Sequence, residues 1–359
     1  MLKVGLIGTR GLPNVHGGFE RFAELLVEDP RWQGADIEFV VYGEYNDDRY
    51  NEWTRQRNVG FTKNSRRFWF YFRSCILATR ECDIVLCCSV PLSIFSYWPG
   101  LFGKPLIMNP DGCEWRRTKW STVGRWLIAA MYVPAIAAAK KVVIDAEALR
   151  SDFKLKAKGI YIPYAAPDPT VHVLREETRV RAGVTRPYVL VVARLEPENN
   201  VALVVDAFRS LGDCGADLIV VGNATTPHYH EVLASAASDN IHFVGGIYDQ
   251  KMLDELRSNC IGYFHGHSVG GTNPSLLEAL AAVRGRMLCH DNKYNREVAG
   301  SEAEYFDAPA KLAGRITDVI AEAKTDPWPR QPLRDERFHP ETIFQKYKAL
   351  FLSLAPKKA

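Results

Sequence analysis

Residues 188–200 read YVLVVARLEPENN, an apolar run that ends in a polar loop, and residues 1–11 open the chain in the same way with MLKVGLIGTRG. Short runs rich in Val and Ile, each followed by an amphipathic stretch, are typical of successive βαβ units around a parallel sheet. Two such series follow one another along the chain. We therefore predict an α/β fold of two Rossmann-like, doubly wound domains with parallel sheets.

The two series also set the predicted domain boundaries. The first has candidate strands at residues 3–7, 37–42, 83–87, 105–109, 141–145 and 160–162, and the second at 188–193, 217–221, 241–244, 261–265 and 286–290. A connector with three prolines, at residues 162–169, separates them. We predict an N-terminal domain over residues 1–166 and a C-terminal domain over 167–335.

A terminal helix is predicted within residues 336–359. Ile343, Tyr347, Leu350 and Leu354 fall on one helical face of residues 341–354. This apolar face needs a surface to cover. It either packs back on the N-terminal domain or caps the C-terminal one.

Composition and the distribution of apolar residues argue against a nucleic-acid-binding protein, a zinc protein and a membrane-spanning protein. The chain has 359 residues, 47% of them hydrophobic, and a net charge of +3, which is too small to indicate nucleic-acid binding. The eight cysteines lack the spacing of a zinc site and are expected to be buried thiols. The longest apolar stretches, at residues 90–102 and 126–139, are interrupted by prolines and too short to span a bilayer. Residues 1–11 lack the features of a signal peptide, so we expect a cytoplasmic protein.

The strongest candidate site is the loop HGHSVGGTNPSLLE at residues 265–278, between a buried strand and a helix. Its glycines expose backbone N–H groups, and the positive end of the helix favours an anion, so a diphosphate would bind there without a metal. The predicted donor-binding residues in the loop are His267, Gly270, Gly271, Thr272 and Asn273. Glu278, one turn into the helix, would accept hydrogen bonds from ribose hydroxyls. A structural cap with a surface glutamate is the alternative.

Arg194 is the predicted cationic partner of that diphosphate, because a guanidinium matches phosphate oxygens and stabilises a departing diphosphate. A surface ion-pair residue is the equally weighted alternative. In the first domain, GTRGLPNVHGGFE at residues 8–20 places Gly17 and Gly18 at a helix entrance. Glu44 lies near the place of the ribose-binding acid of an NAD site, but the loop is too long for a dinucleotide turn.

These residues resemble retaining glycosyltransferases of the GT-B fold, particularly family 4. The resemblance implies two domains that face each other across a cleft, with Gly17, Gly18, Arg194 and Glu278 at matching positions. Two positions differ from the family pattern. Asn199 stands where a phosphate-binding lysine is expected, and Gly270 stands where the first glutamate of Glu-x7-Glu is expected.

Four segments, GTRGLPNVHGGFE, NPDGCEWRRTKWS, ARLEPENN and HGHSVGGTNPSLLEAL, are similar to a bacterial branch of rhamnosyltransferases that use dTDP-L-rhamnose. The resemblance implies a metal-independent retaining transferase with no other cofactor, and no D-x-D motif occurs. Asp111 is the candidate that orients the acceptor hydroxyl or stabilises the charge on the sugar, with Arg194 and Glu278 as the other catalytic candidates. An Asx turn is the alternative role for Asp111.

A basic and aromatic segment at residues 55–73 contains Arg66, Arg67 and Trp69 but no acidic residue. Such a segment either binds the cytoplasmic face of the membrane or forms an ordinary amphipathic helix. A membrane role fits a lipid-diphosphate-linked saccharide acceptor in bacterial surface polysaccharide assembly, with Glu114 and Lys119 as further acceptor-side candidates. We expect a peripheral protein on the inner face of the cell membrane.

Two other functions stay open. A sugar-nucleotide 2-epimerase would use carboxylates and a histidine, for which His265, His267 and Glu278 are candidates. A catalytically silent sugar-nucleotide-binding scaffold is compatible with Gly270. Incubation with the donor alone separates the first from a transferase, because an epimerase converts the donor without an acceptor.

Overall fold

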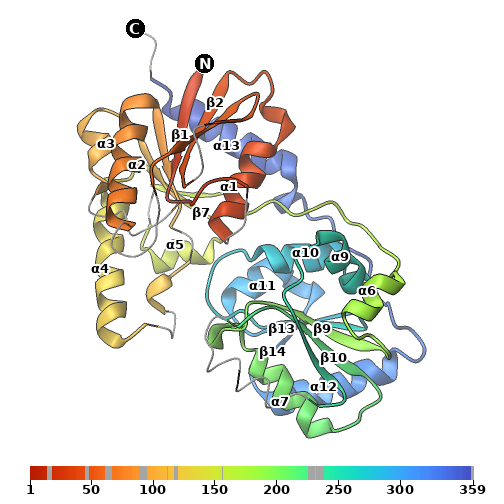
Figure 1. The fold of residues 1–359 in the computed structure, drawn as a ribbon. Coiled ribbons are helices and arrows are strands. Elements are labelled where there is room, and N and C mark those ends of the chain that lie inside the picture. The colour runs from red at the N-terminus through yellow and green to blue at the C-terminus, as the bar shows by residue number, and fades with distance from the viewer. Residues whose placement is uncertain are drawn as a thin grey trace. The chain divides into compact units, whose positions relative to one another are not determined.

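The computed structural model, drawn in Figure 1, describes residues 1–13, 18–44, 48–60, 67–88, 95–110, 112–116, 120–155, 157–224, 231 and 238–356. It divides into two units. Unit 1 comprises Met1–Arg116, Trp120–Ala165 and Pro340–Ala359, and unit 2 comprises Ala166–His339. The chain thus passes from unit 1 to unit 2 after Ala165 and returns at Pro340.

Unit 1 contains an eight-stranded sheet and the helices that cover it. The strands are β1 (Leu2–Ile7), β2 (Ile37–Gly43), β3 (Asp48–Asn51), β4 (Thr54–Asn58), β5 (Ile84–Cys87), β6 (Leu106–Met108), β7 (Lys141–Ile144) and β8 (Gly159–Tyr161). The helices are α1 (Gly18–Glu28), α2 (Arg67–Glu81), α3 (Trp98–Leu101), α4 (Thr122–Ala138), α5 (Ala148–Asp152) and α13 (Pro340–Leu354), with short 3-10 turns at Pro30–Trp32 and Glu114–Arg116.

The order of the unit 1 strands is β3-β4-β2-β1-β5-β6-β7-β8, and every pair is parallel except β3 with β4. The six predicted strands of this unit are confirmed. Strands β3 and β4 were not predicted, because an edge hairpin of polar residues carries no apolar run. The predicted parallel sheet is confirmed, and the antiparallel pair β3–β4 is an addition at its edge.

The basic and aromatic segment is divided between two elements, so the interpretation of residues 55–73 as one amphipathic helix is wrong. Arg55 and Arg57 lie on β4, where they form ion pairs with Glu38 and Glu81 at 2.7 and 2.8 Å. The helix α2 begins only at Arg67. Thr54 and Gln56 are buried, and the arginines that alternate with them are exposed. This alternation is the two-residue period of a strand.

Helices cover both faces of the unit 1 sheet. Figure 1 shows α2, α3 and α4 along one side of it and α1 with α13 along the other. The glycine at position 5 lets α2 pack closely on β1, since a Cβ there would lie 3.2 Å from the Cβ of Ala78. On the opposite face, the Phe351 ring of α13 contacts the rings of Trp32 and Phe39, with centroids 6.0 Å apart in both pairs.

The terminal helix α13 therefore packs on unit 1. Its predicted apolar residues Ile343, Tyr347 and Leu350 are buried, whereas Leu354 is only partly buried. Tyr347 also contacts the Phe22 ring of α1. Of the two surfaces considered for this helix, the structure shows the first-domain surface.

Unit 2 has a six-stranded parallel sheet in the order β11-β10-β9-β12-β13-β14. The strands are β9 (Tyr188–Val192), β10 (Asp217–Val221), β11 (Ile241–Gly245), β12 (Gly262–His265), β13 (Arg286–His290) and β14 (Glu304–Phe306). The helices are α6 (Glu176–Arg181), α7 (Val201–Leu211), α9 (Gln250–Asn259), α10 (Pro274–Ala282), α11 (Lys293–Ala299) and α12 (Pro309–Glu322), with 3-10 turns at Pro197–Asn199, Gly300–Glu302 and Glu336–Phe338. The five predicted strands are confirmed, and the three-residue β14 was not predicted.

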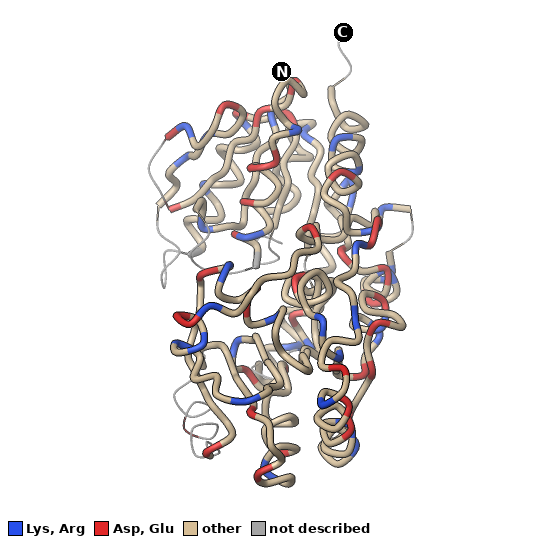
Figure 2. The backbone as a smooth tube through the Cα atoms, turned by 90° about the vertical axis from the view of Figure 1, so that its right-hand side faces the viewer, with Lys and Arg blue, Asp and Glu red and all other residues tan. Residues whose placement is uncertain are grey.

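Buried apolar side chains from α7, α12 and the sheet form the core of unit 2. All eight cysteines are thiols and seven are buried, as expected from the sequence. Burial raises the pKa of Cys260 and Cys289 to about 12. Figure 2 shows Lys and Arg interspersed with Asp and Glu along the chain, consistent with the small net charge. Within the described ranges, no helix is long and apolar enough to cross a bilayer.

Candidate functional site

In the unit 2 sheet, successive strands are added in one direction from β9 to β11 and in the opposite direction from β12 to β14. Strands β10 and β11 lie to one side of β9, and β13 and β14 lie to the other side of β12. In open α/β sheets, ligands bind outside the carboxyl ends of the strands at such a reversal. The loops that follow β9 and β12 carry Arg194 and residues 266–273. The topology therefore places both predicted strand-to-helix junctions at the expected ligand-binding edge.

Hydrogen bonds join these two loops directly. Ser268 donates to the carbonyl oxygen of Glu198 from its backbone N–H, at 3.0 Å, and from its hydroxyl, at 2.8 Å. The side-chain amide of Asn200 donates to the carbonyl oxygen of Gly266 at 2.8 Å. A Cβ at Gly266 would lie only 2.0 Å from the Asn199 carbonyl oxygen, so only glycine permits this approach. The loops form one continuous surface at the sheet edge.

The N-terminus of α10 opens from the second loop. Asn273 is its N-cap and accepts a hydrogen bond from the Ser275 N–H at 2.9 Å, and Pro274 occupies the first turn as predicted. In the part of the chain that the structure describes, the backbone N–H groups of Gly270, Gly271 and Asn273 donate no hydrogen bond. Unbonded backbone N–H groups beside the positive end of a helix are the kind of donors that bind anions in proteins.

The glycine at position 270 is explained by its backbone. Its φ is +141°, in a region that L residues rarely adopt, and a Cβ there would meet no atom within 4 Å. Conformation rather than crowding therefore favours glycine at the position where the resembling family has a glutamate. Thr272, in the same loop, is buried.

Arg194 and Asn199 have different environments in the first loop. The Arg194 side chain is 64% exposed, and its only ion pair among the described residues is with Glu196, 3.5 Å away. Although Glu196 is buried, most of the Arg194 side chain is exposed, which leaves the guanidinium accessible to a bound anion. Asn199 is buried, and its side-chain amide donates to the Arg194 carbonyl oxygen at 2.7 Å. Asn199 thus holds the loop that carries Arg194, and its predicted contact with the donor stays a prediction.

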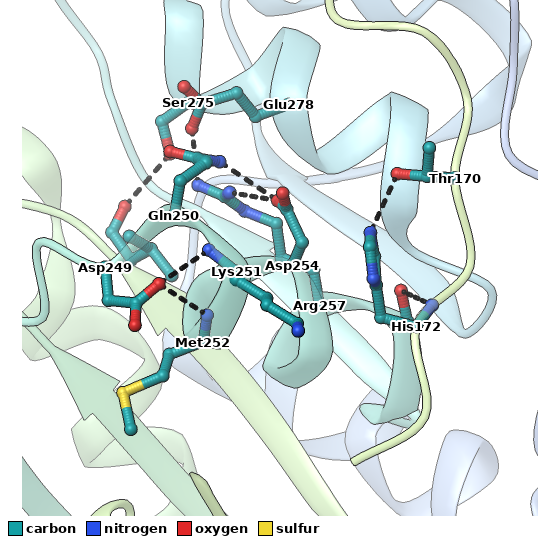
Figure 3. Close-up of polar contacts among 12 residues, drawn as sticks. Thr170, His172, Asp249, Gln250, Lys251, Met252, Asp254, Arg257, Ser275 and Glu278 are labelled. Atoms are coloured by element: carbon teal, nitrogen blue, oxygen red, sulfur yellow. Dashed lines mark hydrogen bonds and ion pairs between the residues drawn. The ribbon is translucent and has the colours of Figure 1, made fainter. Parts of the chain in front are cut away.

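Glu278 is held by an arginine that the sequence did not reveal (Figure 3). Arg257 of α9 donates from Nη2 to Glu278 Oε2 at 2.6 Å and from Nη1 to Asp254 Oδ1 at 3.1 Å. Its side chain is 1% exposed, whereas the Glu278 side chain is 21% exposed. Burial acts to lower the pKa of Arg257, but the negative charges of Glu278 and Asp254 outweigh it and raise the pKa.

A second chain of contacts fixes the first turn of α10. The Tyr263 and Ser275 hydroxyls lie 2.9 Å apart, and Ser275 donates to the Val192 carbonyl oxygen at 3.2 Å. Tyr263 must then be the donor to Ser275, because each hydroxyl has one proton. These contacts tie α10 to the end of β9, the strand that precedes Arg194.

The two histidines of the loop stack on one another, with ring centroids 4.4 Å apart and an interplanar angle of 15°. His265 is fully buried, and burial, followed by the charges of His267 and His290, holds its pKa well below the ordinary value. Its ring is therefore neutral and faces the interior. An epimerase would need a histidine exposed to the sugar, which His265 does not provide.

Comparison with known proteins finds a similarity in this region. Residues 175–336 match the family model of glycosyl transferases group 1. The matched residues include the unit 2 sheet and both loops of the candidate site. No curated protein matches the sequence.

Solved structures resemble the whole chain in fold. HepE from Anabaena, in complex with UDP-glucose, is 14% identical, with 98% of this chain and 100% of HepE covered and a TM-score of 0.76. A glycosyltransferase from Rickettsia africae is 13% identical, with 99% of each chain covered and a TM-score of 0.72. An α,α-trehalose-phosphate synthase from Burkholderia vietnamiensis is 12% identical, with 98% of this chain and 100% of the synthase covered and a TM-score of 0.68. The predicted GT-B fold is thereby confirmed.

The predicted residues of unit 1 are less completely described. Gly17, Arg66, Asp111 and Lys119 lie outside the described residues, and so does the side chain of Arg67. Gly18 begins α1. Trp69 on α2 is 60% exposed, and Glu114 accepts a hydrogen bond from the Trp120 indole at 3.1 Å.

The turn after β1 does not provide an NAD site. Arg10 forms an ion pair with Glu44 at 3.1 Å, and its backbone N–H donates to Glu20 at 3.0 Å. Glu44 is therefore engaged by an arginine rather than presented to a ribose. Among the described residues, no cluster of His, Cys, Asp or Glu has the arrangement of a metal site.

Proposed function

We propose that the chain is a glycosyltransferase whose group 1 glycosyl transferase region binds the diphosphate of a nucleotide-sugar donor at the β9 and β12 loop edge. The observation that carries the proposal is the anion cradle formed by the free N–H groups of Gly270, Gly271 and Asn273 at the N-terminus of α10. Arg194 adds a fixed positive charge on the adjoining loop, which is joined to the cradle by hydrogen bonds. Together they would neutralise a diphosphate without a metal ion.

Glu278 would bind the ribose of the donor. Arg257 engages Oε2 and leaves Oε1 without a partner in the described structure. A carboxylate fixed through one oxygen is oriented to accept hydrogen bonds from sugar hydroxyls through the other. Both the diphosphate and the ribose would then contact the same strand-to-helix junction.

The proposed reaction retains the configuration of the sugar. The acceptor oxygen forms a bond to the anomeric carbon on the face from which the diphosphate leaves, as the bond between that carbon and the phosphate oxygen breaks. A donor phosphate oxygen takes the acceptor proton, so no protein nucleophile is needed. The role of Arg194 and the amide cradle is to stabilise the negative charge that develops on the leaving diphosphate. Asp111 is proposed to orient the acceptor hydroxyl.

The donor proposed from the sequence resemblance is dTDP-L-rhamnose, and the proposed acceptor is a lipid-diphosphate-linked saccharide at the inner face of the membrane. The departures at Asn199 and Gly270 support a donor other than the usual one, because they alter contacts that the resembling family makes with phosphate and sugar. The exposed Trp69 supports a membrane-facing first domain.

Calorimetric titration of UDP and dTDP into the protein tests the binding site. Replacing Arg194 by Ala should weaken nucleoside-diphosphate binding by about tenfold to a hundredfold, the value of one or two charge-assisted hydrogen bonds. Arg179→Ala is the matched control, because Arg179 is also an exposed arginine in a weak ion pair of unit 2, on α6. Equal affinities for Arg194→Ala and the parent protein would show that the diphosphate binds elsewhere.

A further inference from the structure

Helix α4 presents an apolar face to solvent. Arg125 is the only charged residue among its 17 residues. After the polar first residue Thr122, the exposed positions of the helix are 123, 126, 127, 130, 133 and 137, which recur at helical spacing and are all apolar. The exposed fractions of the four largest are 70% for Val123, 76% for Trp126, 62% for Leu127 and 70% for Val133. A surface helix normally turns its apolar stripe inward, so a stripe turned outward marks a contact surface.

The inner face of α4 is firmly attached to unit 1. Tyr132 and Ala135 are buried, and the Tyr132 hydroxyl lies 3.2 and 3.4 Å from the carbonyl oxygens of Gly112 and Pro110. The Tyr132 ring also packs against Trp115 and stacks on Phe153. Because this side fixes the rotation of the helix about its axis, the exposed stripe cannot turn inward without losing these contacts.

The charges around α4 point to an anionic surface as its partner. Among the described residues of 115–144, four are Lys or Arg and none is Asp or Glu, and the described residues of 84–110 also include no Asp or Glu. Helices α2 and α3 lie on the same side of the sheet (Figure 1), and their exposed apolar residues include Trp69 and Leu101. Apolar and aromatic side chains flanked by bases suit a bilayer interface with anionic headgroups.

We infer that α4 is the segment of unit 1 that inserts into an anionic lipid bilayer, with its axis along the membrane surface. Val123, Trp126, Leu127 and Val133 enter the acyl boundary, and the neighbouring Lys and Arg residues contact the phosphates. This inference rests on the proposed function, because an enzyme acting on a lipid-linked acceptor must approach the bilayer. It assigns the membrane contact to a helix outside the basic and aromatic segment at residues 55–73.

Flotation with vesicles tests the inference on the full chain. The parent should float with vesicles of phosphatidylcholine and phosphatidylglycerol, and less with phosphatidylcholine alone. The double variant Val123→Asn, Leu127→Asn should lose at least about tenfold in vesicle partitioning. Val180→Asn on α6 is the matched control, because Val180 is also 70% exposed, and it should float like the parent.

Depth-dependent quenching gives a second readout. Brominated acyl chains should quench the tryptophan fluorescence of the parent, and Trp126→Phe should lower that quenching, whereas Trp69→Phe should lower it less. Unchanged flotation of the double variant would overturn the inference, and so would quenching that is undiminished in Trp126→Phe. A parent dimer in solution that the double variant converts to monomer would assign the stripe to self-association instead.

Nucleotide binding separates this inference from the proposed function. The double variant should bind UDP or dTDP with the affinity of the parent, since α4 lies outside unit 2. A parent that binds nucleotide but does not float would contradict only the role of α4. A parent that floats but binds no nucleoside diphosphate would contradict the proposed transferase.

Discussion

Replacing Arg257 by Met would show how strongly the buried arginine supports Glu278. The substitution keeps an apolar stem but leaves the Glu278 and Asp254 carboxylates without the guanidinium that bridges them, at 2.6 and 3.1 Å. Loss of one partner from a buried ion pair costs about 3–5 kcal/mol. Because both carboxylates keep about a fifth of their exposure, water can reach them, and we expect roughly 2–3 kcal/mol.

Urea unfolding followed by the fluorescence and circular dichroism of the full chain measures this loss. A double-mutant cycle with Glu278→Gln isolates the pair, and the expected coupling energy is about 1–3 kcal/mol. Arg179→Met, which removes an exposed arginine paired with Glu176, should change the free energy of unfolding by less than about 0.5 kcal/mol.

The same variant should weaken donor binding as well as stability, because Glu278 loses the contact that orients it. A lower affinity for UDP in Arg257→Met at a temperature where the protein is fully folded would support the positioning role. A loss of stability below about 0.5 kcal/mol, or a coupling energy of zero, would refute the reasoning from burial and geometry.

Three further predictions concern the pH response, the donor loop and the terminal helix. The pKa values of His265 and His290 are lowered in the folded protein, so the unfolded chain binds more protons than the folded chain below pH about 6.5. As the pH falls from about 6.5 to 5, the free energy of unfolding should therefore decrease by up to about 1.4 kcal/mol per pH unit for each histidine. A flat urea-unfolding profile over this range would contradict it. Gly270→Ala should destabilise by about 1–2 kcal/mol from its backbone conformation alone, whereas Gly314→Ala inside α12 should be neutral or stabilising; equal effects in thermal melts would argue against this. Phe351→Ala should cost about 3–5 kcal/mol, and a melting temperature equal to that of the parent would show that α13 does not complete the unit 1 core.

Local sequence signals were sufficient for most of the fold. Buried parallel strands such as β9 and β12 are short apolar runs bounded by loop residues, and Asn273 with Pro274 marks the start of α10. The polar strands β3 and β4 carry no such run, because an edge hairpin buries few side chains. Local patterns also do not predict the order of the strands, because that order depends on pairing between segments that lie far apart in the sequence.

The candidate site also combines features that the sequence predicts with features that it does not. The positions of Arg194 and the α10 loop at the edge of the sheet were predictable because each follows a strand directly. The partner of Glu278 was not, because Arg257 lies 21 residues earlier on an amphipathic helix, in a sequence that carries no motif. The outward stripe of α4 could not be told from a buried one, because periodicity does not show which way a helix faces.

A crystal structure of the protein with UDP tests the proposed donor site most directly. We expect the two phosphates to lie within hydrogen-bonding distance of the Gly270, Gly271 and Asn273 N–H groups, with the Arg194 guanidinium turned toward them and a ribose hydroxyl on Glu278. A diphosphate bound away from the β9 and β12 loops, with these three amides still unoccupied, would contradict it.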